Sequence, residues 1–325
     1  MDVRLITPNG VERRKPDELE SLLDGQGLIW IDVAHWDAVT EEKLAGKLNL
    51  HPRAMRDCAV RNPVPKMHVY PDQVFLVLHA PERGARGHVH YIELDQYVGP
   101  NWLLTVHGPM NPVVPLEAAY LETGATARRL ESGKLNPSRS CELSAAVVVA
   151  LTNRLRDFLT ELTQEVWALE RKVTGGHMGD PEQFLEELFA VRHGLLAVRT
   201  MAAMSREVYG RMCRLSVFGP GGAAQLEDLQ DQFQRIAAMA DSQREYLQGV
   251  IEFYQTRTGT KMTIAAERLA VIAAVTLPIT ALSSIMGMNV IVNDSTHWAT
   301  LWLLLGVMSV MSLMVLIWAH RKGWW

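Results

Sequence analysis

Cysteine is scarce in this sequence of 325 residues, and the three that occur, Cys58, Cys141 and Cys213, are scattered. No two of them form a Cys-x-x-Cys pair, which argues against a disulfide framework and a thiolate metal site, so we expect small buried residues. Also missing are a Walker-type phosphate loop, a nucleophile elbow and a His-Glu-x-x-His zinc motif. An ATP-driven pump and a hydrolase therefore have no motif to support them.

Charge is absent from two long segments near the C-terminus. The bulk composition, with 48% hydrophobic residues and a net charge of -4, is that of a soluble protein. However, residues 269–288 and 299–319 contain no charged side chain, and each segment is long enough as a helix to cross about 30 Å of hydrocarbon. We predict two transmembrane helices at these positions. The alternative is a pair of buried core helices.

The flanking charges predict the orientation of these two spans. Lys261 and Arg268 precede the first span, the tail 320–325 after the second is basic, and the connecting segment "VIVNDSTH" has no Lys or Arg. The N-terminal residues contain no apolar run of signal-peptide length, so we expect the first part of the chain to stay in the cytoplasm. The positive-inside rule then predicts a multi-pass protein of the plasma (inner) membrane, with both termini cytoplasmic.

Residues 1–114 have the pattern of a cytoplasmic α/β domain. Short runs rich in β-branched and aromatic residues predict strands. These runs are "LIWIDV" (28–33), "QVFLVLH" (73–79), "HVHYIELDQYV" (88–98) and "WLLTVH" (102–107). Between them, "AVTEEKLAGKLNL" (38–50) has helical periodicity, and "RNPVPKMHVYPD" (61–72) has the prolines of a loop.

Residues 115–224 change to helix-forming composition. One helix is predicted from about Ser140 to Gly175, and a second from Pro181 to about Cys213, so the two form an antiparallel hairpin. From Gln225 to Met288 the only proline is Pro278, which predicts a single helix of about 96 Å.

Residues 225–268 of this long helix are predicted to form a stalk that enters the membrane as the first span. One apolar face recurs along the stalk with the spacing of a packed helix. Its members are Leu226, Leu229, Phe233, Ile236, Ala240, Leu247, Val250 and Tyr254. We expect this face to pack against the helical hairpin.

Small and polar residues follow one face of the first span and predict a pore lining. In alternating steps of three and four, this stripe contains Thr263, Ala266, Ala270, Ala273, Leu277, Thr280, Ser284 and Gly287. Identical helices around an axis give such a stripe, and several copies are needed because two spans cannot enclose water. Leu277 would form a water-repelling ring. The alternative is close packing of transmembrane helices through small residues, with hydroxyls bonding across the interface or to their own helix.

Asn289, in the outer segment 289–298, is a candidate for cation selection. Mg²⁺ loses its waters reluctantly, so a selective entrance should offer hydrogen-bond acceptors to a hydrated ion. A ring of Asn289 amides would do so, Gly287 would keep the neck wide, and Asp294 would concentrate cations at the mouth. The alternatives are that Asn289 caps a helix end and that Asp294 is a solvated turn residue.

The motif "GMN" (287–289), followed by a short loop, a last span and a basic end with tryptophans, resembles the CorA family of magnesium and cobalt channels. The segments "LIWIDV", "VFLVLH", "YIELDQYVGPNWLLTVH" and "LPITALSSIMGMN" occur in the family's order. The resemblance implies an α+β membrane protein that assembles as a funnel-shaped homopentamer and admits Mg²⁺ passively. It implies that the lipid bilayer and divalent ions are the partners of the protein. It implies no enzymatic activity, no organic cofactor and no nucleic-acid partner.

The resemblance also implies roles for individual residues. It maps the selectivity filter onto Gly287, Met288 and Asn289. It maps the pore constrictions onto Thr263, Ala266, Leu269, Leu277, Thr280 and Ser284. The sequence departs from the family at Ala266 and Leu277, where many relatives carry methionine. It also has only Asp294 in the outer loop, where relatives often have an acidic cluster.

An acidic face at the start of the stalk is the candidate regulatory site. Steps of seven residues back from Ser284 and Gly287 reach Asp228 and Asp231, although a straight helix drifts from this register. The segment "LEDLQDQ" resembles the family segment whose first Asp helps to bind regulatory Mg²⁺ between adjacent cytoplasmic domains. Glu82 is a second candidate ligand. The alternative is a solvated acidic stretch.

Two further interpretations remain open at this point. His88 and His90 point to the same side of a predicted strand, which suits either a transition-metal ligand pair or a solvated strand face. For the whole protein, the rival functions are a zinc transporter of the same superfamily and a membrane-anchored scaffold that only oligomerises.

Overall fold

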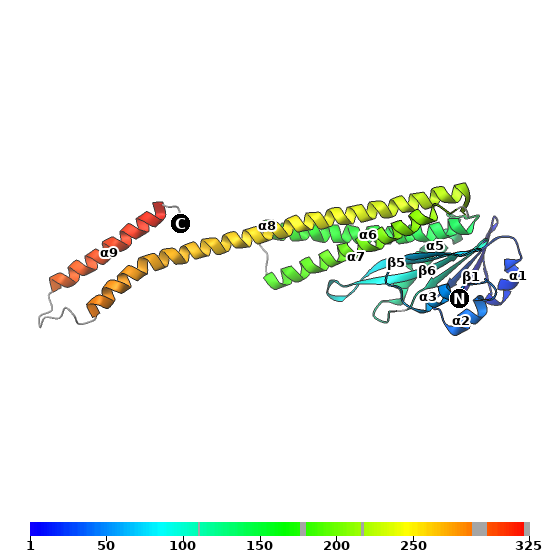
Figure 1. The fold of residues 1–325 in the computed structure, drawn as a ribbon, viewed down its shortest axis with the longest axis horizontal. Helices are drawn as coiled ribbons and strands as arrows, with labels where there is room; N and C mark the ends of the chain where they lie inside the picture. Colours follow the sequence, from blue (N-terminus) through cyan, green and yellow to red (C-terminus); the bar gives the residue numbers. More distant parts are fainter. Residues whose placement is uncertain (110, 176–179, 216–217, 288–297, 322–325) are drawn as a thin grey trace. The chain divides into compact units, whose positions relative to one another are not determined.

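A computed structural model describes residues 1–109, 111–175, 180–215, 218–287 and 298–321 (Figure 1). The chain divides into two compact units, Met1–Val250 and Ile251–Trp325. The helices of the described part are α1 (Leu19–Leu23), α2 (Ala38–Leu44), α3 (Pro52–Ala59), α4 (Leu116–Ala119), α5 (Leu121–Glu131), α6 (Ser140–Gly175), α7 (Pro181–Met212), α8 (Gly219–Gly287) and α9 (Trp298–Arg321), with 3₁₀ turns η1 (Pro16–Glu18) and η2 (Ala85–Gly87).

The first unit is built on one seven-stranded mixed sheet. Its strands are β1 (Asp2–Thr7), β2 (Gly10–Arg14), β3 (Leu28–Val33), β4 (Lys66–Val69), β5 (Val74–Arg83), β6 (Val89–Val98) and β7 (Trp102–His107), in the order β2-β1-β3-β7-β6-β5-β4. Only β3 and β7 run parallel, and the long β5–β6 hairpin pairs from Val74 opposite Val98 to Arg83 opposite Val89. The predicted strands over 28–33, 73–79, 88–98 and 102–107 are confirmed as β3, β5, β6 and β7.

Three local predictions about the α/β domain need correction. The predicted loop 61–72 contains the edge strand β4, because its prolines lie outside Lys66–Val69 and an edge strand needs only one paired side. The predicted helix 38–50 ends at Leu44 as α2, and a separate helix α3 follows. The β1–β2 hairpin has no counterpart in the prediction. Its turn places Gly10 at a φ of 135°, which glycine adopts most easily.

Helices cover both faces of the sheet. On one face, α2 and α3 contribute Leu44, Ala54 and Cys58 to a core that also contains Phe75 and Tyr97 of the sheet. On the other face, α6 and α7 contact β5 and β6, and the Ser144 hydroxyl donates to the Gln96 side chain. Cys58 and Cys141 are buried as predicted, whereas Cys213 is half-buried, and all three are free thiols.

The predicted helical hairpin is confirmed by α6 and α7. Lys172 near the end of α6 pairs with Glu187 near the start of α7, and Leu162 approaches Gly194 further along both helices, so the helices are antiparallel. Helix α7 begins as expected, because Asp180 accepts a hydrogen bond from the Glu182 amide and Pro181 stands at a position that needs no N–H.

Helix α8 begins at Gly219, six residues before the predicted start at Gln225. The segment "FGPGG" was expected to interrupt the chain, but a proline in the first turn costs no hydrogen bond. The predicted packed face of the stalk is confirmed within the first unit, since Leu226, Phe233 and Leu247 are buried. Thr152 of α6 and Arg199 of α7 bond to Gln232 and Asp241 of α8. These three helices lie side by side in Figure 1.

A pair of carboxyl groups is buried beneath α3. Glu93 and Asp95 are two residues apart on β6, so both point to the same face of the sheet. Glu93 accepts hydrogen bonds from the Asn62 backbone and side chain at 2.7 and 2.5 Å, and the Asp95 carboxyl interacts with the side chains of Glu93 and Cys58. Burial raises the pKa of Asp95 well above its usual range, and the adjacent Glu93 raises it further. Both causes favour the protonated form of the Asp95 carboxyl in the folded protein.

Asp95→Asn is expected to stabilise the protein at alkaline pH. The unfolded chain releases the Asp95 proton above a pKa of about 3.9, whereas the folded chain retains it, so wild-type stability falls as pH rises towards the folded-state pKa. Each unit of pKa difference is worth about 1.4 kcal/mol. An asparagine amide keeps a donor beside Glu93 without this cost. The melting temperature of the variant should exceed that of the wild type near pH 8, and the gain should vanish near pH 4.

Asp32→Asn is the matched control, and it should change the melting temperature near pH 8 in the opposite direction. Burial alone would raise the pKa of Asp32, but hydrogen bonds and charge from His107, with Thr105 and Arg4, lower it below its usual value. Asp32 thus stabilises the fold at neutral pH, and its asparagine variant should melt lower near pH 8. A lower melting temperature for Asp95→Asn near pH 8 would show that Asp95 is ionised in the fold.

Candidate functional site

The second unit begins within α8 and contains its most apolar part. Among the described residues, α8 alone is long and apolar enough to cross a membrane, with a mean hydropathy of 1.6 over its most apolar window. Only 6% of that window is buried, and Leu269, Ile272 and Leu277 are each more than half exposed. A core helix of a soluble protein would be covered. This apolar surface therefore requires lipid or further copies of the chain around it.

The predicted pore stripe lies on α8 and is accessible along its whole described length. Its residues are all exposed in the single chain: Thr263, Ala266, Leu269, Ala270, Ala273, Leu277, Thr280 and Ser284. One helix cannot enclose a pathway, so the assignment of these residues to a pore stays a prediction. The structure supplies the necessary condition, which is that none of the described residues of the same chain covers them.

Three threonine hydroxyls of α8 donate their protons within the helix. Thr263, Thr276 and Thr280 each donate a hydrogen bond to the backbone carbonyl four residues earlier, at 3.1, 2.9 and 2.9 Å. Because the proton of each hydroxyl is engaged in its own helix, the oxygen lone pairs are left for outside partners. On the stripe, the hydroxyl oxygens of Thr263 and Thr280 are thus hydrogen-bond acceptors, which suits a cation and its bound waters.

Pro278 stands inside α8, directly after Leu277. It has no N–H, so it cannot donate to the carbonyl of Ala274 as the other residues of the helix do. The helix therefore lacks one backbone hydrogen bond at the level of the predicted apolar ring.

The predicted selectivity residues lie at the limit of the described chain. Gly287 is the last residue of α8, whereas Met288, Asn289 and Asp294 fall outside the described residues. Helix α9 follows from Trp298, and its described apolar stretch runs from Leu305 to Arg321. The roles of this loop and of the second span stay predictions.

The three predicted regulatory carboxylates have different surroundings. Glu82, near the end of β5, forms a 2.6 Å ion pair with Arg154, which also binds Glu122 at 3.0 Å. Asp228 and Asp231 are exposed on α8, and Asp228 accepts a 2.7 Å hydrogen bond from Gln232. Within the described residues of one chain, no three His, Cys, Asp or Glu side chains form a group that could hold a metal. Further ligands for an ion at Asp228 would therefore come from water or from a second subunit, and Glu82 is already engaged in an ion pair with Arg154.

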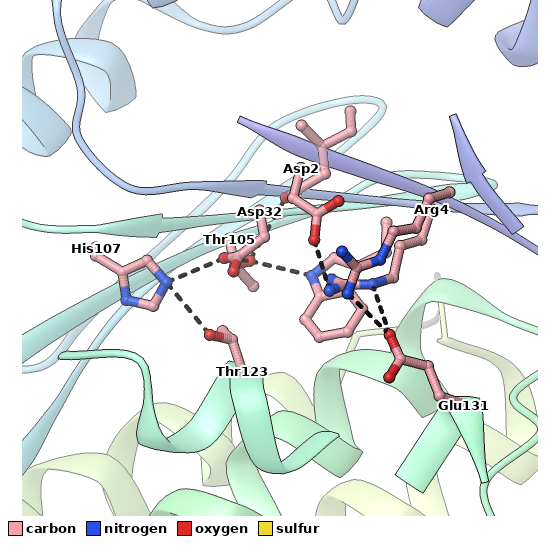
Figure 2. A network of polar contacts seen from close by, with 10 residues as sticks. Asp2, Arg4, Asp32, Thr105, His107, Thr123 and Glu131 are labelled. Carbon is pink, nitrogen blue, oxygen red and sulfur yellow. Dashed lines mark hydrogen bonds and ion pairs between the residues drawn. The ribbon is translucent and has the colours of Figure 1, made fainter. Parts of the chain in front are cut away.

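Figure 2 shows a buried polar network that the sequence did not reveal. Oδ1 of Asp32 accepts hydrogen bonds from the Thr105 hydroxyl at 2.5 Å and from Nε2 of His107 at 3.0 Å. Thr123 of α5 lies 3.4 Å from the same imidazole nitrogen. A catalytic relay of nucleophile, base and acid needs the acid and the nucleophile on different nitrogens of the histidine. Here Asp32 and Thr123 both face Nε2 of His107, so the network does not have the geometry of such a relay. Its contacts connect β3, β7 and α5.

Pairing in the sheet explains why this network escapes sequence analysis. Asp32 and Thr105 are register partners in the parallel β3–β7 pair, although 73 residues separate them in the chain. No local sequence pattern links these two residues. Only knowledge of the strand order would have placed them together.

Comparison with known proteins covers nearly the whole chain. A family model described as CorA-like Mg²⁺ transporter protein matches residues 25–321. The cobalt/magnesium transport protein CorA of Thermotoga maritima is 21% identical over 323 residues, covering 95% of this chain and 88% of that protein.

Two solved structures show the same fold. The CorA magnesium transporter from Methanocaldococcus jannaschii matches with a TM-score of 0.81 at 17% identity, covering 100% of this chain and 98% of that chain. The cytoplasmic domain of ZntB from Vibrio parahaemolyticus matches with a TM-score of 0.61 at 9% identity, covering 80% of this chain and 98% of that domain. At these identities the likeness establishes the fold alone.

Proposed function

The chain belongs to the family of CorA-like Mg²⁺ transporter proteins, and from that premise we propose that it forms a homopentameric channel for Mg²⁺ influx that also admits Co²⁺. The family consists of metal ion transporters, not enzymes. The observation that carries the proposal is the family match over residues 25–321, which includes most of the α/β domain, the stalk and both predicted spans.

In the proposed assembly, five copies of α8 surround the pore and α9 faces the lipid. The exposed apolar surface of α8 supports this arrangement, because a pentamer would cover one side of the helix and lipid the other. The N-terminal unit and the C-terminal tail lie in the cytoplasm, in agreement with the basic residues that flank the spans. The protein then sits in the plasma membrane with a cytoplasmic funnel.

Ion selection is proposed to occur at Gly287, Met288 and Asn289. Five amide oxygens of Asn289 would accept hydrogen bonds from the water shell of Mg²⁺, so the ion need not be dehydrated at the entrance. Asp294 adds one negative charge per subunit to the outer mouth. Further in, the hydroxyl oxygens of Thr280 and Thr263 continue the row of acceptors.

Gating is proposed to depend on cytoplasmic Mg²⁺ bound near Asp228, with Asp231 as its neighbour on the stalk. The ion would offset repulsion between carboxylates of adjacent subunits and hold the closed state. Glu82 contributes less to this proposal than the sequence suggested, because it is already engaged in an ion pair with Arg154. The effect on the gate is limited to the difference in Mg²⁺ affinity between the two states.

Ion flux into proteoliposomes tests the proposed function and separates its rivals. Purified full-length protein should carry Mg²⁺ into vesicles, Co²⁺ should compete, and Zn²⁺ should compete less well. Transport of Zn²⁺ in preference to Mg²⁺ would favour the zinc transporter. The zinc transporter remains the alternative because the cytoplasmic domain of ZntB has the same fold, and this similarity concerns the fold alone. No flux of any divalent ion from a correctly assembled oligomer would favour the scaffold.

Leu277→Ser is expected to increase Mg²⁺ leak under conditions that close the wild-type channel. A ring of leucines repels water, and its replacement by serine lowers the cost of wetting the pore. The effect on closed-state flux should be at least about tenfold, since a change of about 1.4 kcal/mol in a barrier is tenfold in rate. The measurement is vesicle uptake with high Mg²⁺ on the cytoplasmic side.

Ile272→Ser is the matched control for Leu277→Ser. Ile272 is 58% exposed on the same helix but lies off the predicted stripe. Its serine variant should leak like the wild type. Equal leak from both variants would mean that any polar substitution in the span disturbs the protein, and the Leu277 constriction would be rejected.

A further inference from the structure

The tip of the β5–β6 hairpin is held tightly against α7. A Cβ atom at Gly87 would lie 2.1 Å from Cβ of Ala190, and Gly87 has a φ of 74°. Both features require glycine at this position. The hairpin tip therefore has a fixed place on α7, and the residues beside the contact have fixed neighbours.

Three histidines gather at this contact. His88 follows Gly87 directly, and His193 lies three residues after Ala190, hence on the same side of α7. The ring centroids of His88 and His193 are 5.9 Å apart with an angle of 20° between the rings. His90 lies 4.7 Å from His88 in an edge-on arrangement of 78°. Two of these residues formed the candidate ligand pair of the sequence, and α7 adds the third.

The hydrogen bonds of Asn111 determine the role of His90. The Val113 amide donates to Oδ1 of Asn111, so this amide presents Nδ2, a donor, to Nδ1 of His90 at 3.2 Å. Nδ1 of His90 is then an acceptor and the neutral ring carries its proton on Nε2. Because Asn111 occupies Nδ1 of His90, the other two histidines are the candidates for metal binding.

We propose that His88 and His193 form a two-imidazole site for a transition-metal ion such as Ni²⁺, Zn²⁺ or Co²⁺. Two imidazoles bound to one ion at about 2.1 Å have ring centroids about 5.3 Å apart at a tetrahedral angle and about 6.5 Å apart in a linear arrangement. The observed 5.9 Å lies between these values, so one ion can contact both rings at an N–metal–N angle wider than tetrahedral. The described residues contain no group of three suitable side chains, so water completes the coordination. An open cavity of about 1030 Å³ beside both rings gives the ion access.

The proposed site differs in chemistry from the proposed Mg²⁺ pathway. Mg²⁺ prefers oxygen ligands, whereas imidazole suits Zn²⁺, Ni²⁺ and Co²⁺. An ion bound at this site would join the hairpin tip to α7 and stabilise the first unit through mass action. The cavity lining also contains Arg86, Glu186 and Glu187, and Glu187 is paired with Lys172, so the site has no large net charge. The inference does not depend on ion conduction.

Calorimetric titration with Ni²⁺ tests the site in the full-length, tag-free protein. Millimolar Mg²⁺ is present throughout to occupy oxygen-ligand sites. The wild type should bind one Ni²⁺ per chain, and its melting temperature should rise with Ni²⁺. His88→Ala and His193→Ala should each weaken this binding by at least about tenfold, since even the loss of an outer partner of a metal ligand costs that much. His35→Ala, at an exposed histidine elsewhere, should bind like the wild type.

Two results would overturn the proposal. One is the absence of Ni²⁺ binding by the wild type in millimolar Mg²⁺. The other is unchanged Ni²⁺ affinity in both His88→Ala and His193→Ala. The melting temperatures without Ni²⁺ show whether either variant is folded. If one variant fails to fold, the other decides the question.

Discussion

Asn289→Ala should reduce Mg²⁺ uptake by at least about tenfold, which corresponds to about 1.4 kcal/mol in the transport barrier. The substitution removes all the amide oxygens of the proposed acceptor ring at once, so a hydrated Mg²⁺ loses its partners at the entrance. Asn289→Asp should instead alter the selectivity, because a ring of carboxylates binds cations strongly and slows their release. The measurement is Mg²⁺ uptake by proteoliposomes, with size-exclusion chromatography to confirm that the oligomer is intact.

Asn293→Ala provides the matched control, because Asn293 lies in the same outer segment and offers the same amide. Its uptake should equal that of the wild type. Wild-type uptake by Asn289→Ala would remove the selectivity assignment. Loss of uptake in both variants with an intact oligomer would mean that the whole segment, and not the position of one amide, determines entry.

Asp228→Lys should make protease protection of the cytoplasmic domain nearly independent of Mg²⁺. In the proposed mechanism, bound Mg²⁺ offsets carboxylate repulsion between subunits, and a lysine ammonium supplies positive charge at the same position without any ion. The wild type should become resistant to cleavage as Mg²⁺ rises through the millimolar range, whereas the variant should be resistant at both low and high Mg²⁺. Cleavage is followed on gels in a series of Mg²⁺ concentrations.

Glu227→Lys makes the same charge change one residue earlier, about 100° around the helix. Its cleavage should keep the Mg²⁺ response of the wild type, because Asp228 is unchanged. If Asp228→Lys still responds to Mg²⁺ like the wild type, the sensor lies elsewhere. If Glu227→Lys loses the response as well, the acidic surface as a whole, and not a site at Asp228, senses the ion.

Segments with a strong local pattern were predictable from sequence. The strands β3, β5, β6 and β7, the hairpin α6–α7 and the packed face of α8 each follow from residues a few positions apart. The edge strand β4 and the early start of α8 were missed because prolines near them indicated breaks. In both cases the proline occupies a position where its missing N–H costs nothing.

The proposed regulatory site depends on contacts between residues that are far apart in the sequence. Glu82 had the right type and approximate position for a ligand, but it pairs with Arg154, 72 residues away in the chain. The sequence contains both residues and no indication that they meet. In the same way His193 joins His88, and His107 joins Asp32, only because the sheet and α7 bring distant segments together.

The sequence by itself determined the class of the protein, the two charge-free segments, the "GMN" motif and the long helix, because hydrophobicity and helix periodicity act through neighbours in the chain. Tertiary structure alone decided which carboxylates are exposed, which are paired and which have a raised pKa. Those properties depend on burial and on charges within a few ångströms, and such neighbours are set by strand order and helix packing.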